Sequence, residues 1–101
     1  MNIKRKSDEG KMTVFVSGRI DTATAPEFEE GVKPHLKGVK TLVLDFKEVN
    51  YVSSAGLRVL LSLEKLMEEQ GEMKLIHVSE AVCDVFEVTG FDEILNFETG
   101  E

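Results

Sequence analysis

Short apolar segments with the pattern of β-strands alternate with amphipathic segments along almost the whole chain. The strand-like segments are Ile3 to Asp8, Met12 to Ser17, Thr41 to Phe46, Met73 to Val78 and Ile94 to Phe97. In the second of these, alternate residues from Met12 to Val16 fall on one face, as in a half-buried strand. The third is continuously apolar until Asp45, near its expected end, which is typical of a central strand covered on both faces.

Three helices are predicted between these strands. The first begins at Thr24-Ala-Pro-Glu27, which fits a capping box with proline in the first turn, and Pro34 should bend or loosen its last turn. The second runs from about Ser54 to Gln70, and the third begins at Ser79 and ends at Gly90. This order predicts an α/β fold: a mixed sheet of four to five strands with an antiparallel edge strand, and three helices mainly on one face.

The size and charge of the chain exclude several classes of protein. Its 101 residues, of which 42% are hydrophobic, suffice for one domain with one core. The net charge of −7 argues against nucleic-acid binding, which needs a basic surface. No apolar stretch is long enough to span a membrane and no signal-peptide pattern is present, so we expect a cytoplasmic protein.

The sequence carries no pattern typical of an enzyme or a metal site. Cys83, His35 and His77 share no ligand spacing, and neither a phosphate-binding loop nor a nucleophile elbow is present. We therefore predict no cofactor, no metal and no intrinsic catalysis.

The most informative segment is Val49 to Leu61, in which a strand leads through a short turn into a helix. Ser53 and Ser54 stand where this helix begins. A hydroxyl there can cap backbone N–H groups, and a phosphate there would be favoured by the same groups and by the helix dipole. The sequence leaves open which of the two roles applies to Ser54.

A helical wheel divides the second helix into a core face and a solvent face. The core face carries Gly56, Val59, Leu60, Leu63, Leu66 and Met67. Leu57 and Leu61 fall near Ser54 instead, on the side expected to face water. Two leucines on consecutive turns favour a contact surface, and a wide core stripe is the alternative.

The segment Asp45 to Leu61 resembles the STAS domain of bacterial anti-sigma factor antagonists, as do Gly18-Arg-Ile-Asp21 and the order of strands and helices. The resemblance covers essentially the whole chain. It implies a protein that binds an anti-sigma factor with serine kinase activity and so releases a sigma factor. It also implies that the kinase phosphorylates a serine at the start of the second helix, that the complex then dissociates, and that a serine phosphatase resets the cycle.

The family motif, Asp-Ser-(Ser/Thr/Ala)-Gly-Leu, places the phosphorylated serine at Ser54 when it is aligned on Gly56-Leu57. The aspartate of the motif is Ser53 in this chain, so either serine could be modified, with Ser54 favoured. The resemblance further implies that the loop at Asp21 lies near this serine, although an ordinary turn residue fits Asp21 equally well. The expected partner-binding residues are Asp21, Thr22, Ser53, Ser54, Leu57, Arg58 and Leu61.

Two other functions fit the same sequence. The first is a STAS scaffold in a signalling or lipid-transport complex that is never phosphorylated, which the serine at position 53 favours. The second, more remote, is a small hydrolase or nucleotide-handling enzyme that uses Ser54 with Asp21. Mapping the phosphate after incubation with a cognate kinase separates the first alternative from the phosphorylation switch.

Overall fold

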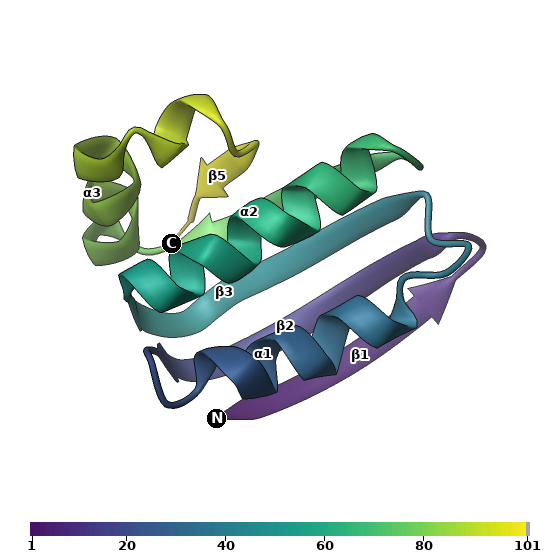
Figure 1. Ribbon diagram of the computed structural model, residues 1–101, viewed down its shortest axis with the longest axis horizontal. Coiled ribbons are helices and arrows are strands. Elements are labelled where there is room, and N and C mark those ends of the chain that lie inside the picture. The colour runs from purple at the N-terminus through teal and green to yellow at the C-terminus, as the bar shows by residue number, and fades with distance from the viewer. Residues whose placement is uncertain (101) are drawn as a thin grey trace.

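The computed structural model describes residues 1–100, which form a five-stranded sheet and three α-helices (Figure 1). In chain order the elements are β1 (Asn2–Asp8), β2 (Lys11–Ile20), α1 (Ala25–Val32), β3 (Thr41–Val52), α2 (Ser54–Glu68), β4 (Glu72–Val78), α3 (Glu80–Thr89) and β5 (Phe97–Thr99). The strands follow one another across the sheet in the same order. β1 is antiparallel to β2, and all other neighbours are parallel, which confirms the predicted fold class.

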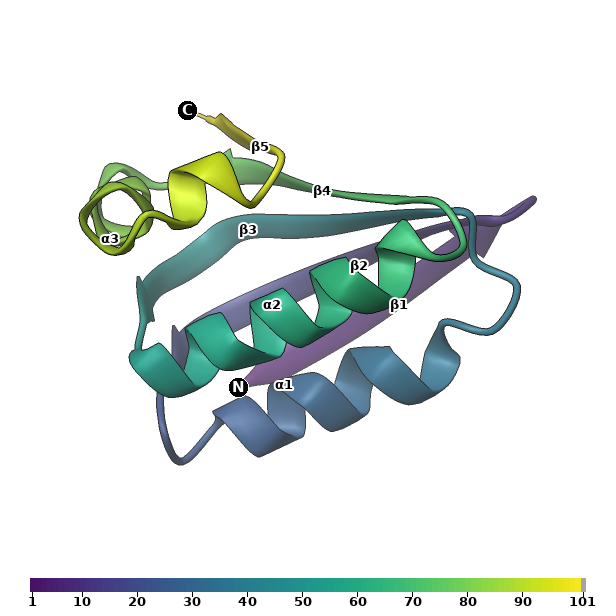
Figure 2. The ribbon, with the colours of Figure 1, turned by 45° about the horizontal axis from the view of Figure 1, so that its top comes forward.

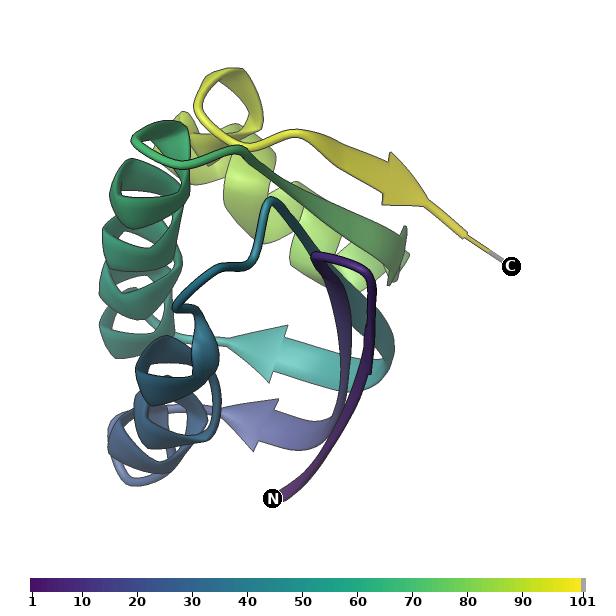
Figure 3. The same cartoon turned by 90° about the vertical axis from the view of Figure 1, so that its right-hand side faces the viewer.

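The helices are arranged by the crossovers between the parallel strands. Each crossover advances by one strand in the same direction, so crossovers of one hand carry their helices to the same side. α1 and α2 lie side by side on one face of the sheet (Figures 2 and 3). α3 packs beside the last part of β3, past Asp45, where the pairing of β3 with β4 has ended.

The opposite face of β1, β2 and β3 carries no helix within residues 1–100 (Figure 3). We call it the helix-free face. Phe15 lies on it because its strand neighbours, Val14 and Val16, are buried on the other side, and the Phe15 side chain is 44% exposed. No helix of the described part of the chain is long and apolar enough to cross a bilayer.

One hydrophobic core lies between the sheet and the helices. Met12, Val14 and Val16 are buried in it, as their alternation predicted. β3 is the central strand and is buried on both faces, also as predicted: Phe46 packs edge-to-face on Phe28 of α1, with 6.3 Å between ring centroids. On the helix-free face, buried residues Val43 and Asp45 lie between their pairing partners on β2 and β4.

The ends of α3 and the C-terminal end of α1 follow the sequence, whereas the N-terminal cap of α1 does not. α3 begins after Ser79, whose hydroxyl accepts a hydrogen bond from the N–H of Val82, and ends at Gly90 in the left-handed region with φ of 82°. α1 ends at Val32 and gives way to a single 3-10 turn, Lys33–His35, around Pro34. The predicted capping box of α1 is wrong, because the Thr24 hydroxyl bonds to the preceding loop instead of to α1.

Several element boundaries differ from the prediction. β3 continues to Val52, so Asp45 lies inside the strand and does not end it. The pairing register of β3 with β2 shifts twice, which breaks the alternation that marks a strand in the sequence. β5 begins at Phe97 instead of Ile94, and α2 ends at Glu68, two residues before the predicted Gln70.

Candidate functional site

The loop after β2 and the turn after β3 lie beside each other at one edge of the sheet. β2 and β3 are parallel neighbours, so the residues that follow them emerge at the same edge. The backbone N–H of Ser53 donates to the carbonyl oxygen of Ile20 at 2.8 Å and ties the two segments together. The fold thus brings Asp21 and Thr22 close to the start of α2, which is the arrangement that the family resemblance implied.

Ser53 and Ser54 have different roles in the structure. Ser53 is the N-cap of α2: its Oγ accepts a hydrogen bond from the N–H of Gly56 at 3.4 Å, and its carbonyl oxygen accepts one from Leu57 at 2.9 Å. Ser54 is the first residue of the helix, and its side chain is exposed. Its hydroxyl has no hydrogen-bond partner among residues 1–100. Capping is therefore the function of Ser53, and the Ser54 hydroxyl faces solvent.

Gly56 lets α2 begin directly above the ends of β2 and β3. A Cβ atom on Gly56 would lie 2.7 Å from Cγ2 of Ile20 and 2.9 Å from Cγ1 of Val52, both much closer than a packed side chain permits. It would also lie 3.1 Å from the carbonyl oxygen of Ile20. The absence of a side chain at position 56 therefore sets the height of the first turn, and with it the position of Ser54.

Asp21 is held by bonds within its own loop. Its Oδ1 accepts hydrogen bonds from the N–H groups of Ala23 and Thr24, at 3.0 and 3.1 Å, and from the Thr24 hydroxyl at 3.2 Å. The bond from the Thr24 N–H is the main reason why the pKa of Asp21 is lowered, and partial desolvation opposes it. This geometry matches the turn-residue alternative. The other carboxylate oxygen faces Arg19, with 3.7 Å between Oδ2 and Nε.

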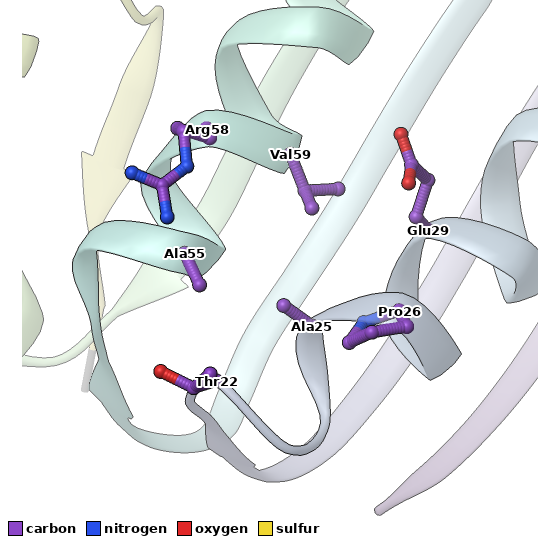
Figure 4. A pocket seen from close by; sticks show the side chains of 7 residues that line it. All are labelled: Thr22, Ala25, Pro26, Glu29, Ala55, Arg58 and Val59. Atoms are coloured by element: carbon purple, nitrogen blue, oxygen red, sulfur yellow. The ribbon is translucent and has the colours of Figure 1, made fainter.

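An open groove of about 260 Å³ separates the first turns of α1 and α2. It is lined by Thr22, Ala25, Pro26, Glu29, Ala55, Arg58 and Val59. Figure 4 shows Arg58 on α2 and Glu29 on α1 at opposite sides of the groove, with Thr22 close to the first turn of α2. Oε2 of Glu29 is 3.5 Å from Nζ of Lys33. Arg58 has no ion-pair partner in the part of the chain that the structure describes. Arg58 is exposed one turn after Ser54.

The prediction that Leu57 faces solvent is wrong. Its side chain is only 5% exposed and belongs to the hydrophobic core. The buried stripe of α2 is thus wider than the wheel assumed, because it runs from Val59, beside the groove, around to Leu57. Leu61 is half-buried, so of the two leucines only Leu61 offers surface to a partner.

Sequence analysis missed an arginine–tyrosine pair at the same edge of the sheet. The guanidinium of Arg19 stacks over the ring of Tyr51, with Cζ 4.2 Å from the ring centroid. The two residues are register partners on β2 and β3, and this register follows two shifts that the sequence does not reveal. Aromatic and basic residues at corresponding strand ends were the only signal available.

Two further features concern the metal-ligating residue types and the thiol of Cys83. Within residues 1–100, no group of three His, Cys, Asp or Glu side chains is placed to hold a metal ion. Cys83 is half-buried, and its desolvation, together with the nearby carboxylates of Glu87 and Asp84, raises the pKa of its thiol. His77 is a strand residue, as predicted, and its Nδ1 is 3.1 Å from Oδ1 of Asp45.

Comparisons with known proteins identify the family. Residues 2–101 match the model of the STAS domain. The anti-sigma-B factor antagonist of Listeria monocytogenes is 32% identical over 106 residues, which covers 100% of this chain and 93% of that protein. The chain therefore belongs to the STAS domain family.

Solved structures share the same fold. An anti-sigma factor antagonist from Mycobacterium paratuberculosis superposes with a TM-score of 0.87 at 23% identity, over 98% of this chain and 86% of that one. The phosphorylated form of the Bacillus cell fate determinant SpoIIAA superposes with a TM-score of 0.72 at 16% identity, over 97% of this chain and 92% of that one.

Proposed function

We propose that this protein is an anti-sigma factor antagonist controlled by phosphorylation of Ser54. In its unphosphorylated form it binds an anti-sigma factor with serine kinase activity, and a sigma factor is released. Phosphate on Ser54 ends the interaction, and a serine phosphatase restores the binding form. The observation that carries the proposal is the exposed hydroxyl of Ser54 at the start of α2, next to a different serine that caps the helix. The full-length similarity to the Listeria antagonist supports it.

The free domain should keep its fold when Ser54 is phosphorylated. Phosphorylation adds a charge of roughly −1.5 to −2. At the first position of α2 that charge lies at the positive end of the helix dipole, which contributes about 0.3–1 kcal/mol of stabilisation. The Ser54 side chain is already exposed, so the phosphate displaces no core residue.

The complex responds differently, because a docked partner would cover Ser54. Burying a phosphate dianion without a compensating charge costs several kcal/mol. A cost of about 4 kcal/mol weakens binding roughly a thousandfold. Local electrostatics is thus sufficient to end the interaction, and no change in the conformation of the domain is required.

Phosphate mapping tests which serine is modified. The purified domain is incubated with ATP and an anti-sigma factor kinase from its source organism, and the modified residue is identified by mass spectrometry. We expect phosphate on Ser54, with no labelling of Ser54→Ala. Ser53→Ala is the matched control and should still be labelled, because its neighbour keeps the exposed hydroxyl. Labelling of Ser53 in the wild type, or labelling of Ser54→Ala, would contradict the assignment.

The alternative of a scaffold that is never phosphorylated predicts no labelling by any kinase of this class. The hydrolase alternative receives no support from the geometry. Asp21 uses one carboxylate oxygen within its own loop and directs the other toward Arg19, and the described residues provide no base in contact with Ser54.

A further inference from the structure

We propose that Arg19, stacked on Tyr51, is an anchor for a carboxylate of the anti-sigma factor, which therefore presents an acidic surface to this edge of the sheet. The inference rests on the proposed function and adds the chemistry of the partner. It concerns residues that neither the sequence analysis nor the family motif assigns to binding.

Arg19 and Tyr51 extend the candidate site around the edge of the sheet. Ile20 and Val52, the next residues on each strand, are buried in the core. Arg19 and Tyr51 therefore project toward the helix-free face, while Ser54 stands at the edge itself. The hydrogen bond from Ser53 to Ile20 and the ion pair of Arg19 with Asp21 connect the two parts.

The arginine is held in position before any partner arrives. Tyr51 supports one face of the guanidinium at 4.2 Å, and Asp21 lies 3.7 Å from its Nε. The Arg19 side chain is nevertheless 60% exposed. A guanidinium held over a ring by its central carbon keeps N–H donors free, and these donors match the two oxygens of a carboxylate. Little side-chain freedom remains to be lost when a partner binds.

The charges at this edge favour an acidic partner although the whole chain carries a net charge of −7. The carboxylate of Asp21 is engaged by its own loop and by Arg19, and Glu29 faces Lys33. Groups here that can still donate to a partner include the terminal N–H groups of Arg19, the guanidinium of Arg58 and the hydroxyls of Ser54 and Thr22, while Glu48 is an exposed carboxylate on β3. This set of donors complements carboxylates.

The size of a stable interface also requires more surface than Ser54 and the groove supply. Specific complexes bury roughly 800 Å² on each partner. Arginine and tyrosine are among the residues that most often carry binding energy in such interfaces. A partner that covers Ser54 and continues around the edge reaches Tyr51, which is 38% exposed, and Arg19 above it.

An acidic partner surface would also explain why phosphorylation weakens binding instead of strengthening it. Carboxylates placed to meet Arg19 and Arg58 would lie near a phosphate on Ser54 and repel it. The same charges that attract the unphosphorylated domain would thus reject the phosphorylated one. Attraction and release then follow from one electrostatic arrangement.

Calorimetric titration with purified anti-sigma factor kinases of the source organism tests the anchor. Affinities are measured for the wild type, Arg19→Gln, Arg19→Glu and Tyr51→Leu. The matched control is Lys37→Glu, which changes the net charge as much as Arg19→Glu does, but at an exposed lysine before β3, at the opposite end of the strands. Thermal unfolding of each variant verifies its fold.

We expect Arg19→Gln to weaken binding about tenfold or more, because a charge-assisted hydrogen bond is lost. Arg19→Glu should weaken it about a hundredfold, Tyr51→Leu by a smaller factor, and Lys37→Glu by no more than about twofold. Arg19→Gln should also reduce the dependence of affinity on salt, which a merely structural role would not change.

The outcomes separate the two proposals. If the wild type binds and Arg19→Glu binds no more weakly than Lys37→Glu, the anchor is wrong and the proposed function stands. If the wild type binds none of the kinases, the proposed function is wrong, and the proposal that Arg19 is an anchor is wrong as well.

Discussion

The hydroxyl groups of Ser53 and Ser54 lie one residue apart and meet different surroundings. The Ser53 hydroxyl accepts a hydrogen bond from the first turn of α2, while that of Ser54 faces solvent. A family motif aligns residues by position, whereas the capping bond shows which hydroxyl already has a structural function. The division explains how this chain can lack the motif aspartate and still cap the helix, because a serine oxygen at position 53 accepts the same kind of bond.

This division predicts different stabilities for two alanine variants. Ser53→Ala removes the N-cap bond to Gly56 and should lower the free energy of unfolding by about 1 kcal/mol. Ser54→Ala removes no bond and should leave it unchanged within about 0.5 kcal/mol. Urea unfolding of both variants provides the measurement. Equal losses would show that the two hydroxyls share the cap.

Asp21 predicts a pH dependence whose direction follows from its loop bonds. Its folded-state pKa is lowered, first of all by the N–H of Thr24. A carboxyl group with a lowered folded pKa stabilises the folded state above its unfolded pKa, and this contribution is lost as the pH falls through the lowered value. We therefore expect wild type to exceed Asp21→Asn in stability at pH 7, with the difference shrinking as the pH falls below about 4.

Urea unfolding of wild type and Asp21→Asn at several values between pH 3 and 7 measures this difference. A difference that stays constant down to pH 3 would mean that ionised Asp21 does not stabilise the loop.

Among the elements, α2 depends on a close approach to the strands beneath it. Gly56→Ala places a methyl group against Ile20 and Val52, including the backbone of Ile20, and should cost about 1–3 kcal/mol of unfolding free energy. The measurement is chemical unfolding, with partner affinity as a second readout, because a raised first turn also moves Ser54.

Gly31→Ala in α1 is the matched control for this substitution. The atoms nearest to its new methyl group all belong to the Ile3 side chain, with the terminal Cδ1 closest at 2.6 Å, and none is backbone. Alanine favours a helix by about 1 kcal/mol over glycine. We expect a change within about 1 kcal/mol of the wild type in either direction. If Gly56→Ala behaves like Gly31→Ala, the approach of α2 to the strands is not tight.

The elements that sequence reasoning placed well are those with local signals. Ser79 and Gly90 bound α3 because a cap and a left-handed residue act within one turn of the helix. Met12, Val14 and Val16 alternate, and all three are buried. Signals that depend on other residues of the chain failed. The Thr24 hydroxyl fits an N-cap in the sequence, but in the structure it donates to the carbonyl oxygen of Arg19 at the end of β2.

The same distinction between local signals and signals from distant parts of the chain applies to the candidate site. The proximity of Asp21 to the start of α2 was implied by the family resemblance, and the structure gives its physical reason, because β2 and β3 are parallel neighbours that end at one edge of the sheet. The burial of Leu57 could not, because it depends on how far the core wraps around α2. The stacking of Arg19 on Tyr51 depends on strand register, which two shifts in the pairing of β2 and β3 conceal. The contact of His77 with Asp45 involves a residue whose backbone is left-handed, with φ of 57°, and nothing in the sequence marks that conformation at a histidine.

At the scale of the whole molecule, the proposed phosphorylation site lies outside the hydrophobic core. The core holds the sheet, α1 and α2 together, while Ser54 is exposed at one edge of the sheet. In the proposed mechanism, this arrangement would let a phosphate on Ser54 change binding without a change of fold. The charge-exclusion account depends on that separation.

The affinity of the anti-sigma factor for the unphosphorylated and the Ser54-phosphorylated domain, compared by calorimetry, tests this account most directly. The account predicts that binding weakens roughly a thousandfold on phosphorylation, while the thermal unfolding midpoint of the free domain does not fall. Equal affinity of the two forms would contradict it, and so would a loss of binding that accompanies unfolding of the phosphorylated domain.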